Sequence, residues 1–229
     1  MADKLSIIAA KQFATERYIR STHPVLYLPL YRLDGSPSIR SQDAFGHVCT
    51  VTGATWGTTG RTFGGNGDNI VTASAITLTP SAFTALVWWK RLGNSGGATS
   101  DLFHSLLRGI NGYSPNNVSI NKGGTEVRVS CATDSTTRTA IVATTAAPFH
   151  LVGAVWTGTQ LYAVADGVLG TATAAPGALT SFTHVITLGM FDADNYLANG
   201  IISEALVYPR AFNIVERQRF YLTTKWRYK

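Results

Sequence analysis

Residues 200–213 read Gly-Ile-Ile-Ser-Glu-Ala-Leu-Val-Tyr-Pro-Arg-Ala-Phe-Asn, and this stretch decides how the rest of the chain is interpreted. Residues 201–208 are rich in β-branched, aromatic and other apolar side chains, which predicts a strand. Pro209 has no backbone N–H to donate to a sheet, so the strand must end before it. Asn213 stands three positions before Glu216, the pattern of a capping box, so a helix is expected from residue 214.

Working outward from this strand, the chain upstream predicts about a dozen further short strands. Residues 83–92 carry apolar side chains on both faces, as expected of a central strand covered on both sides. Pro29 marks an edge strand or a bulge, and the sequence Lys-Gly-Gly-Thr at 122–125 marks a hairpin turn. The expected strands are 25–31, 48–51, 61–63, 69–72, 83–92, 102–110, 118–121, 126–132, 138–143, 149–156, 160–165 and 183–189.

These pieces resemble, in their order, the laminin-G-like and concanavalin A-like jelly rolls. The matching motifs are Leu-Tyr-Leu-Pro-Leu at 26–30, Gly-Arg-Thr-Phe-Gly-Gly-Asn-Gly-Asp-Asn-Ile at 60–70, Phe-Thr-Ala-Leu-Val-Trp-Trp-Lys at 83–90, Ala-Asp-Gly at 165–167 and the closing strand. The resemblance covers about residues 25–216. It implies an all-β, two-sheet antiparallel jelly-roll sandwich, and it does not name a ligand.

The sequence predicts one sandwich domain with a helix at each end. Residues 1–22 form an N-terminal helical arm, residues 23–213 the laminin-G-like domain, and residues 214–229 a basic C-terminal helix and tail. In the arm, Leu5, Ile8 and Phe13 belong to an apolar stripe with helical spacing. This stripe must pack on the sandwich or on another subunit, and we expect it to serve assembly.

Charge and cysteine content restrict the possible partners. Of the formal charge of +6, residues 208–229 carry +5, so the high pI belongs to the tail. A basic tail can meet nucleic acid or an acidic protein, but a solubilising terminus is the simpler interpretation, and nucleic acid is not expected. Cys49 and Cys131 are interpreted as buried free thiols. With no signal peptide and no apolar run of membrane length, we expect synthesis in a cytoplasm and no membrane partner.

Catalysis is not expected, and no catalytic residue is assigned. Glycan-cleaving relatives need two carboxylates across the sugar, which the glucanase branch places in a Glu-x-Asp-x-x-Glu run that is missing here. Glu126 and Glu204 each stand alone on a predicted strand. A nucleophile motif such as Gly-x-Ser-x-Gly is also missing, and the histidines are scattered at positions 23, 47, 104, 150 and 184.

Two acidic loops carry side chains that could bind a metal. Asp192, Asp194 and Asn195 offer alternating oxygen ligands that suit calcium, and Asp68-Asn69 offers a second cluster. The family often binds calcium at a sheet rim, so calcium is kept as the alternative. Turn capping by these side chains is the preferred interpretation, and no metal or cofactor is assigned.

Glu204 needs a partner if it is buried. Strand alternation places it on the face of Ile202 and Leu206, and a structural ion pair with Arg210 or another arginine is expected. The family usually has an aspartate where this chain has Ser203, which weakens a metal role here.

Several aromatic residues are of the type that stacks on sugar rings. Trp56, Trp88, Trp89 and Trp156 are interpreted mainly as core, whereas Tyr113 and Tyr196 lie in polar loops where exposed contacts are expected. None of these residues is assigned as a site.

Three functions follow from these observations. The first is a non-enzymatic structural protein of a tailed-phage virion, as a capsid decoration or a fibre-like accessory that contacts host-surface glycans. Its partners would be other virion proteins and copies of itself, with a trimer as one option, and its location would be the virion. The alternatives are a carbohydrate-binding module or lectin and, last, a glycan hydrolase. The helical extensions and the resemblance to phage-encoded laminin-G-like proteins favour the first.

Overall fold

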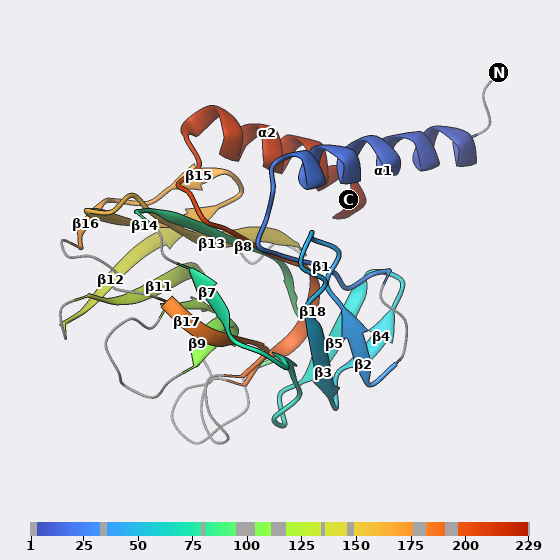
Figure 1. Ribbon diagram of the computed structural model, residues 1–229, viewed down its shortest axis with the longest axis horizontal. Coiled ribbons are helices and arrows are strands. Elements are labelled where there is room, and N and C mark those ends of the chain that lie inside the picture. The colour runs from blue at the N-terminus through green and yellow to red at the C-terminus, as the bar shows by residue number, and fades with distance from the viewer. Residues whose placement is uncertain are drawn as a thin grey trace.

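The computed structural model describes residues 4–32, 36–78, 81–94, 104–110, 118–133, 136–145, 149–175, 182–190 and 197–228. These residues form two antiparallel sheets packed face to face, with helices on one side of the sandwich (Figure 1). The all-β jelly-roll sandwich with a short C-terminal helix is therefore confirmed.

Sheet A, the sheet that the helices cover, is organised around the closing strand. Its strands are β1 (Leu26–Pro29), β4 (Thr55–Gly57), β5 (Gly60–Gly64), β8 (Phe83–Arg91), β13 (His150–Trp156), β14 (Gln160–Ala165), β15 (Val168–Leu169), β16 (Thr173–Ala174) and β18 (Asn199–Tyr208). Their order is β15-β14-β13-β8-β18-β5-β4, with β1 also beside β18 and β16 beside β14. The closing strand β18, whose sequence is quoted at residues 200–213, thus lies inside its sheet, between β8 and β5.

Sheet B forms the other layer. Its strands are β2 (Ser38–Arg40), β3 (Val48–Thr52), β6 (Asn69–Thr72), β7 (Ile76–Leu78), β9 (His104–Ile110), β10 (Val118–Lys122), β11 (Glu126–Thr133), β12 (Thr136–Ala143) and β17 (Phe182–Leu188). Their order is β12-β11-β10-β9-β17-β6-β3-β2, with β7 beside β17. All the predicted strands are present. The short strands β2, β4, β7, β15 and β16 were not predicted, because so few residues give no periodic signal.

Strand β8 shows why sheet A is apolar on both faces. One set of its side chains packs between the sheets, namely Phe83, Ala85, Val87 and Trp89. The alternate side chains Leu86 and Trp88 belong to a second buried cluster, formed with the helices on the outer face. The predicted central, doubly covered strand is confirmed, and the helices provide its second cover.

The helical layer consists of α1 (Lys4–Ser21), α2 (Ile214–Thr224) and the 3₁₀ turn η1 (Lys225–Tyr228). Ile19 of α1 and Phe220 of α2 are both fully buried in the outer cluster with Trp88. The predicted capping box starts α2, since Asn213 Oδ1 accepts from the Glu216 N–H at 3.0 Å and Glu216 Oε2 accepts from the Asn213 N–H at 2.9 Å. The C-terminal segment is therefore part of the fold rather than a solubilising terminus, which corrects that interpretation.

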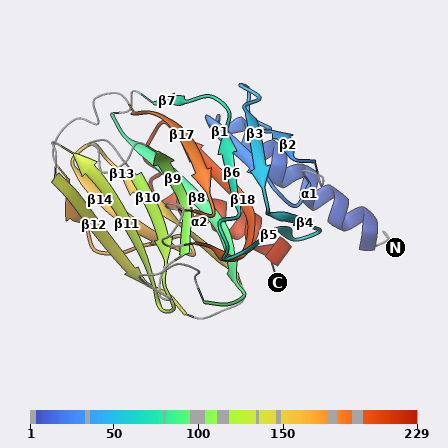
Figure 2. The ribbon, with the colours of Figure 1, turned by 90° about the horizontal axis from the view of Figure 1, so that it is seen from below.

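Helix α1 packs through a different face from the predicted stripe. Thr15 and Ile19 are buried, but Ile8 is 50% exposed and Phe13 is 70% exposed. Its last turns lie on the sandwich, whereas its first turns extend beyond the sheets (Figure 2). The apolar spacing predicted the helix correctly but not which of its faces packs, because that depends on α2.

Strand β18 contains a β-bulge that the alternation rule does not anticipate. Ile202 pairs with Trp89 and Glu204 pairs with Trp88, so Ser203 is the extra residue opposite β8. Ile202 consequently packs between the sheets, whereas Glu204 and Leu206 turn towards the helices. The prediction that Glu204 shares a face with Ile202 is therefore wrong, since one inserted residue reverses the alternation.

Other local predictions are confirmed. Strand β1, which contains Pro29, pairs with β18 alone, as an edge strand does. Cys49 and Cys131 are buried free thiols in sheet B, and burial raises the pKa of both to about 12. Within the described part of the chain, no helix is both long and apolar enough to cross a membrane.

Candidate ligand-binding pocket

The bulge places a carboxylate beneath the helical layer. Glu204 is completely buried, and its Oε1 accepts a hydrogen bond from Arg227 Nη1 of η1, whose side chain is only 7% exposed. The predicted ion pair is present, with Arg227 as the partner. Arg210 instead pairs with Glu216, at 2.5 Å between Nη1 and Oε1.

Aromatic rings surround this ion pair. The Arg227 guanidinium carbon lies 5.1 Å from the centre of the Tyr31 ring and 5.7 Å from that of Trp226. Burial alone lowers the pKa of Arg227, but Glu204 and the neighbouring tyrosines raise it overall. Burial raises the pKa of Glu204, and the Arg227 charge opposes that shift. Since an arginine keeps its proton near neutral pH, ionised Glu204 is the form that balances the buried charge.

Arg227 retains unused hydrogen-bonding capacity. Its Nε and Nη2 atoms are buried and have no hydrogen-bond partner among the described residues. Buried donors of this kind are rare, and each needs a ligand, a water molecule or a functional explanation.

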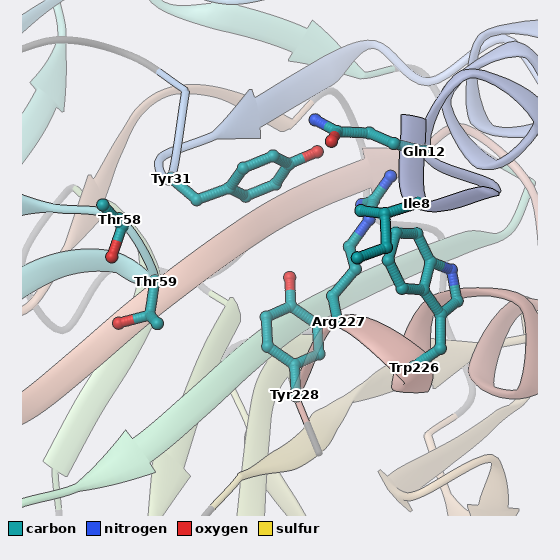
Figure 3. Close-up of a pocket in the computed structure, with 8 residues that line it drawn as sticks. All are labelled: Ile8, Gln12, Tyr31, Thr58, Thr59, Trp226, Arg227 and Tyr228. Atoms are coloured by element: carbon teal, nitrogen blue, oxygen red, sulfur yellow. The ribbon is translucent and has the colours of Figure 1, made fainter. Parts of the chain in front are cut away.

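A pocket of about 180 Å³ lies against this arginine. Four separate parts of the chain line it: α1, the segment after β1, the β4–β5 turn and η1. Figure 3 shows the Arg227 side chain rising between Tyr228 and Trp226 toward α1, with Thr58 and Thr59 on the opposite side. The lining residues are Ile8, Gln12, Tyr31, Thr58, Thr59, Trp226, Arg227 and Tyr228.

The β4–β5 turn is fixed to the bulge. Gly60 has φ +141°, and a side chain there would place Cβ 2.4 Å from the Ile202 carbonyl oxygen, so only glycine fits. The Ser203 hydroxyl, which the bulge turns toward this hairpin, donates to the Thr59 carbonyl. The same inserted residue therefore positions both the buried carboxylate and one wall of the pocket.

The chemistry of this pocket is that of binding. Aromatic faces, threonine hydroxyls and an amide at Gln12 line it and can hold a small polar ring through stacking and hydrogen bonds. The Glu204 carboxylate is fully buried and bonded to Arg227, so it is not placed to transfer protons to a ligand.

Glu126 and two of the histidines, which are possible catalytic residues by type, make structural contacts instead. Glu126 lies in sheet B and bonds Arg128 at 2.9 Å, whereas Glu204 belongs to sheet A, so these two do not form a pair. His47 Nε2 lies 3.0 Å from the Val25 carbonyl oxygen. His150 contacts Asp166 at 2.7 Å. His23 lies just after α1 with φ +54°, and the side chains of the histidines at 104 and 184 lie outside the described residues.

The acidic cluster at Asp68 serves a turn. Its Oδ2 accepts from the Gly64 N–H at 2.6 Å, and Asn69 Nδ2 donates to the Gly67 carbonyl at 2.9 Å. Asp192, Asp194 and Asn195 lie outside the described residues. Across the part of the chain that is described, no group of three or more His, Cys, Asp or Glu side chains could hold a metal ion.

The aromatic residues of the pocket are not the ones that the sequence singled out. Trp88, Trp89 and Trp156 are buried, as predicted, whereas Trp56 is 45% exposed on β4. Tyr113 and Tyr196 lie outside the described residues. The missed residues are Tyr31, Trp226, Arg227 and Tyr228. The sequence does contain an aromatic and basic run at 226–228 that could have indicated the site. It was interpreted only as part of the basic tail.

The fold is similar to that of solved binding domains of botulinum neurotoxins. The serotype D binding domain superposes with a TM-score of 0.65 at 10% identity, over 90% of this chain and 52% of that one. The serotype D ligand-binding domain in complex with N-acetylneuraminic acid gives a TM-score of 0.66 at 12% identity, over 90% and 52%. The serotype G binding domain gives 0.64 at 10%, over 87% and 50%.

The chain thus spans about half the length of the solved structures it matches. At these identities the likeness defines the β-sandwich fold. No protein-family model matches the chain, and no curated protein matches it.

Proposed function

We propose that this protein is a non-enzymatic, lectin-like binding protein that holds a carbohydrate in the Arg227 pocket. The observation that carries the proposal is a pocket with aromatic and hydroxyl-bearing walls, built against the buried Glu204–Arg227 ion pair. The structurally similar toxin domain in complex with N-acetylneuraminic acid supports a carbohydrate as the ligand class.

The pocket favours a small, neutral sugar. At about 180 Å³ it is smaller than the roughly 300–1,000 Å³ typical of drug-sized ligand sites, so it suits a single ring. Glu204 already balances the charge of Arg227, which leaves no net positive charge to attract a carboxylate. The sugar would stack on an aromatic ring and form hydrogen bonds with the Gln12 amide and the Thr58 and Thr59 hydroxyls.

A glycan array followed by calorimetry tests this proposal. The expected result is saturable binding of at least one glycan, with a neutral terminal sugar preferred over N-acetylneuraminic acid. Ile8→Trp should abolish binding, because Ile8 is half exposed and lines the pocket, so a larger side chain fills it. Ile7→Trp is the matched control, since Ile7 is 44% exposed on the same helix and does not line the pocket.

Two outcomes contradict the proposed binding site, and a third contradicts the non-enzymatic assignment. One is an array on which no glycan binds. The other is equal binding by wild type and Ile8→Trp, which would put the site elsewhere. Release of new reducing ends from any bound glycan would contradict the non-enzymatic assignment.

We propose further that the domain acts within a particle, as a capsid decoration or fibre-like accessory of a tailed-phage virion, in a homo-oligomer such as a trimer. The supporting feature is the projecting start of α1, which exposes Ile7, Ile8 and Phe13. Residues 1–22 would then be the assembly arm beside the 23–213 domain and the 214–229 helix. Mass spectrometry of purified particles tests this, and absence of the chain from them would contradict it.

A further inference from the structure

A second hollow lies between α1 and α2 and shares only Trp226 with the sugar pocket. We call it the helix groove. It is open and has a volume of about 490 Å³. Its lining residues are Lys11, Ala14, Thr15, Tyr18, Arg219, Leu222, Thr223 and Trp226.

The helix groove has a fixed floor. Thr15 is buried where the helices meet, and its Oγ1 donates to the Lys11 carbonyl at 2.9 Å and lies 3.3 Å from the Thr223 carbonyl oxygen. Trp226 Nε1 donates to the same Thr15 hydroxyl at 3.2 Å. These bonds tie α1 to the C-terminal segment, so the groove belongs to the folded domain.

The walls of the helix groove combine positive charge with apolar surface. Leu222 is 56% exposed, although leucine side chains are usually buried. The Arg219 guanidinium carbon lies 4.9 Å from the centre of the Tyr18 ring, which leaves its N–H groups available. None of the lining residues is acidic.

The carboxylates nearest in sequence are already engaged. Glu16 pairs with Arg32, and Glu216 pairs with Arg210. Within the described residues, neither Lys11 nor Arg219 takes part in a salt bridge. The groove therefore presents two cations that form no salt bridge within the described part of the chain, beside an exposed leucine.

The charge of the whole chain is concentrated in the same layer. Residues 1–20 carry +2 and residues 208–229 carry +5 of the total +6, which leaves −1 for residues 21–207. A negatively charged partner is thus attracted to the helices rather than to the sandwich.

We propose that the helix groove docks an acidic protein segment in which Asp or Glu flank apolar side chains. The carboxylates would bond Lys11 and Arg219, and an apolar side chain would cover Leu222 and Ala14. Nucleic acid fits less well, because a phosphate backbone makes no use of exposed leucine and alanine. This proposal does not depend on the sugar pocket.

Fluorescence anisotropy with a labelled, acetylated peptide in which Glu flanks Leu and Phe tests the proposal. We expect salt-dependent binding that the double variant Lys11→Glu/Arg219→Glu weakens roughly tenfold or more. Leu222→Ser should weaken it at unchanged charge. The control Arg17→Glu/Arg40→Glu carries the same charge change on exposed residues outside the groove, and it should bind within about threefold of wild type. Thermal melts verify that each variant is folded.

Each other outcome overturns the proposal. Equal loss in both double variants would mean that only net charge matters. Tighter binding of duplex DNA or of phosphatidylserine vesicles than of the peptide would make the partner a nucleic acid or a membrane surface. Unchanged peptide affinity of folded Leu222→Ser would show that no apolar side chain of the peptide covers Leu222.

Discussion

At the scale of the residue, one inserted amino acid organises the site. Ser203 is bulged out of the β18–β8 pairing, and this turns Glu204 from the sandwich interior towards the helices. A buried carboxylate is tolerated only with a partner, and the partner comes from the last turn of the chain, at Arg227. The position of the C-terminal segment is thus linked to the register of the central strand.

Removing that partner should be costly. Arg227→Met leaves Glu204 buried without its cation, and we expect urea unfolding to show a loss of about 3–5 kcal/mol. Combining it with Glu204→Leu should recover most of the loss, because no buried charge remains. Arg40→Met, at an exposed position, is the control, with an expected change within about 0.5 kcal/mol. A single-variant loss no larger than that of the control would show that the pair is not essential.

Lys122 gives a pH-dependent prediction. Burial lowers its pKa to about 8, and its Nζ donates to the Gly123 carbonyl at 2.6 Å. The unfolded chain, with a lysine pKa near 10.4, binds more protons between pH 8 and pH 10, so this group makes the fold more stable as pH rises there. When the pH is raised from 8 to 10, the unfolding free energy of wild type should increase by about 1–2 kcal/mol relative to that of Lys122→Met. A difference between the two proteins that does not change with pH would contradict this prediction.

At the scale of the element, the helices act as the missing cover of sheet A. Trp88 on β8 packs with Tyr221, at 5.9 Å between ring centres, and its Nε1 donates to Thr224 at 3.0 Å. Strand β8 would otherwise expose an apolar outer face, which soluble sheets avoid. Helix α2, which leads directly into the turn that supplies the pocket arginine, is therefore held by its packing on the sheet.

The start of α2 should accordingly affect the whole fold. Asn213→Ala removes the side chain that accepts from the Glu216 N–H, and we expect a loss of about 1 kcal/mol in unfolding free energy. Gln218→Ala, at an exposed position of the same helix, should be neutral. Denaturant titration measures both. Equal effects would show that the cap contributes nothing beyond helix propensity.

At the scale of the whole molecule, the sequence predicted what depends on local pattern. Both faces of β8, the edge position of Pro29 and the capping box at Asn213 follow from periodicity or from a single residue's chemistry, and all are present. The site could not be predicted in the same way. It needs a bulge at Ser203 and a contact with Arg227, 23 positions beyond Glu204, and neither produces a periodic signal.

The N-terminal helix divides into two parts that truncation should separate. Ile19 is fully buried in the cluster with Trp88, whereas Ile8 and Phe13 are exposed. Deleting residues 1–13 should leave a cooperative thermal melt but abolish oligomers, measured by light scattering, if the projecting turns serve assembly. Deleting residues 1–20 also removes Ile19, at an expected further loss of about 2–5 kcal/mol, as for other large buried side chains. Oligomers that survive the shorter deletion would contradict the assembly role of the projecting turns.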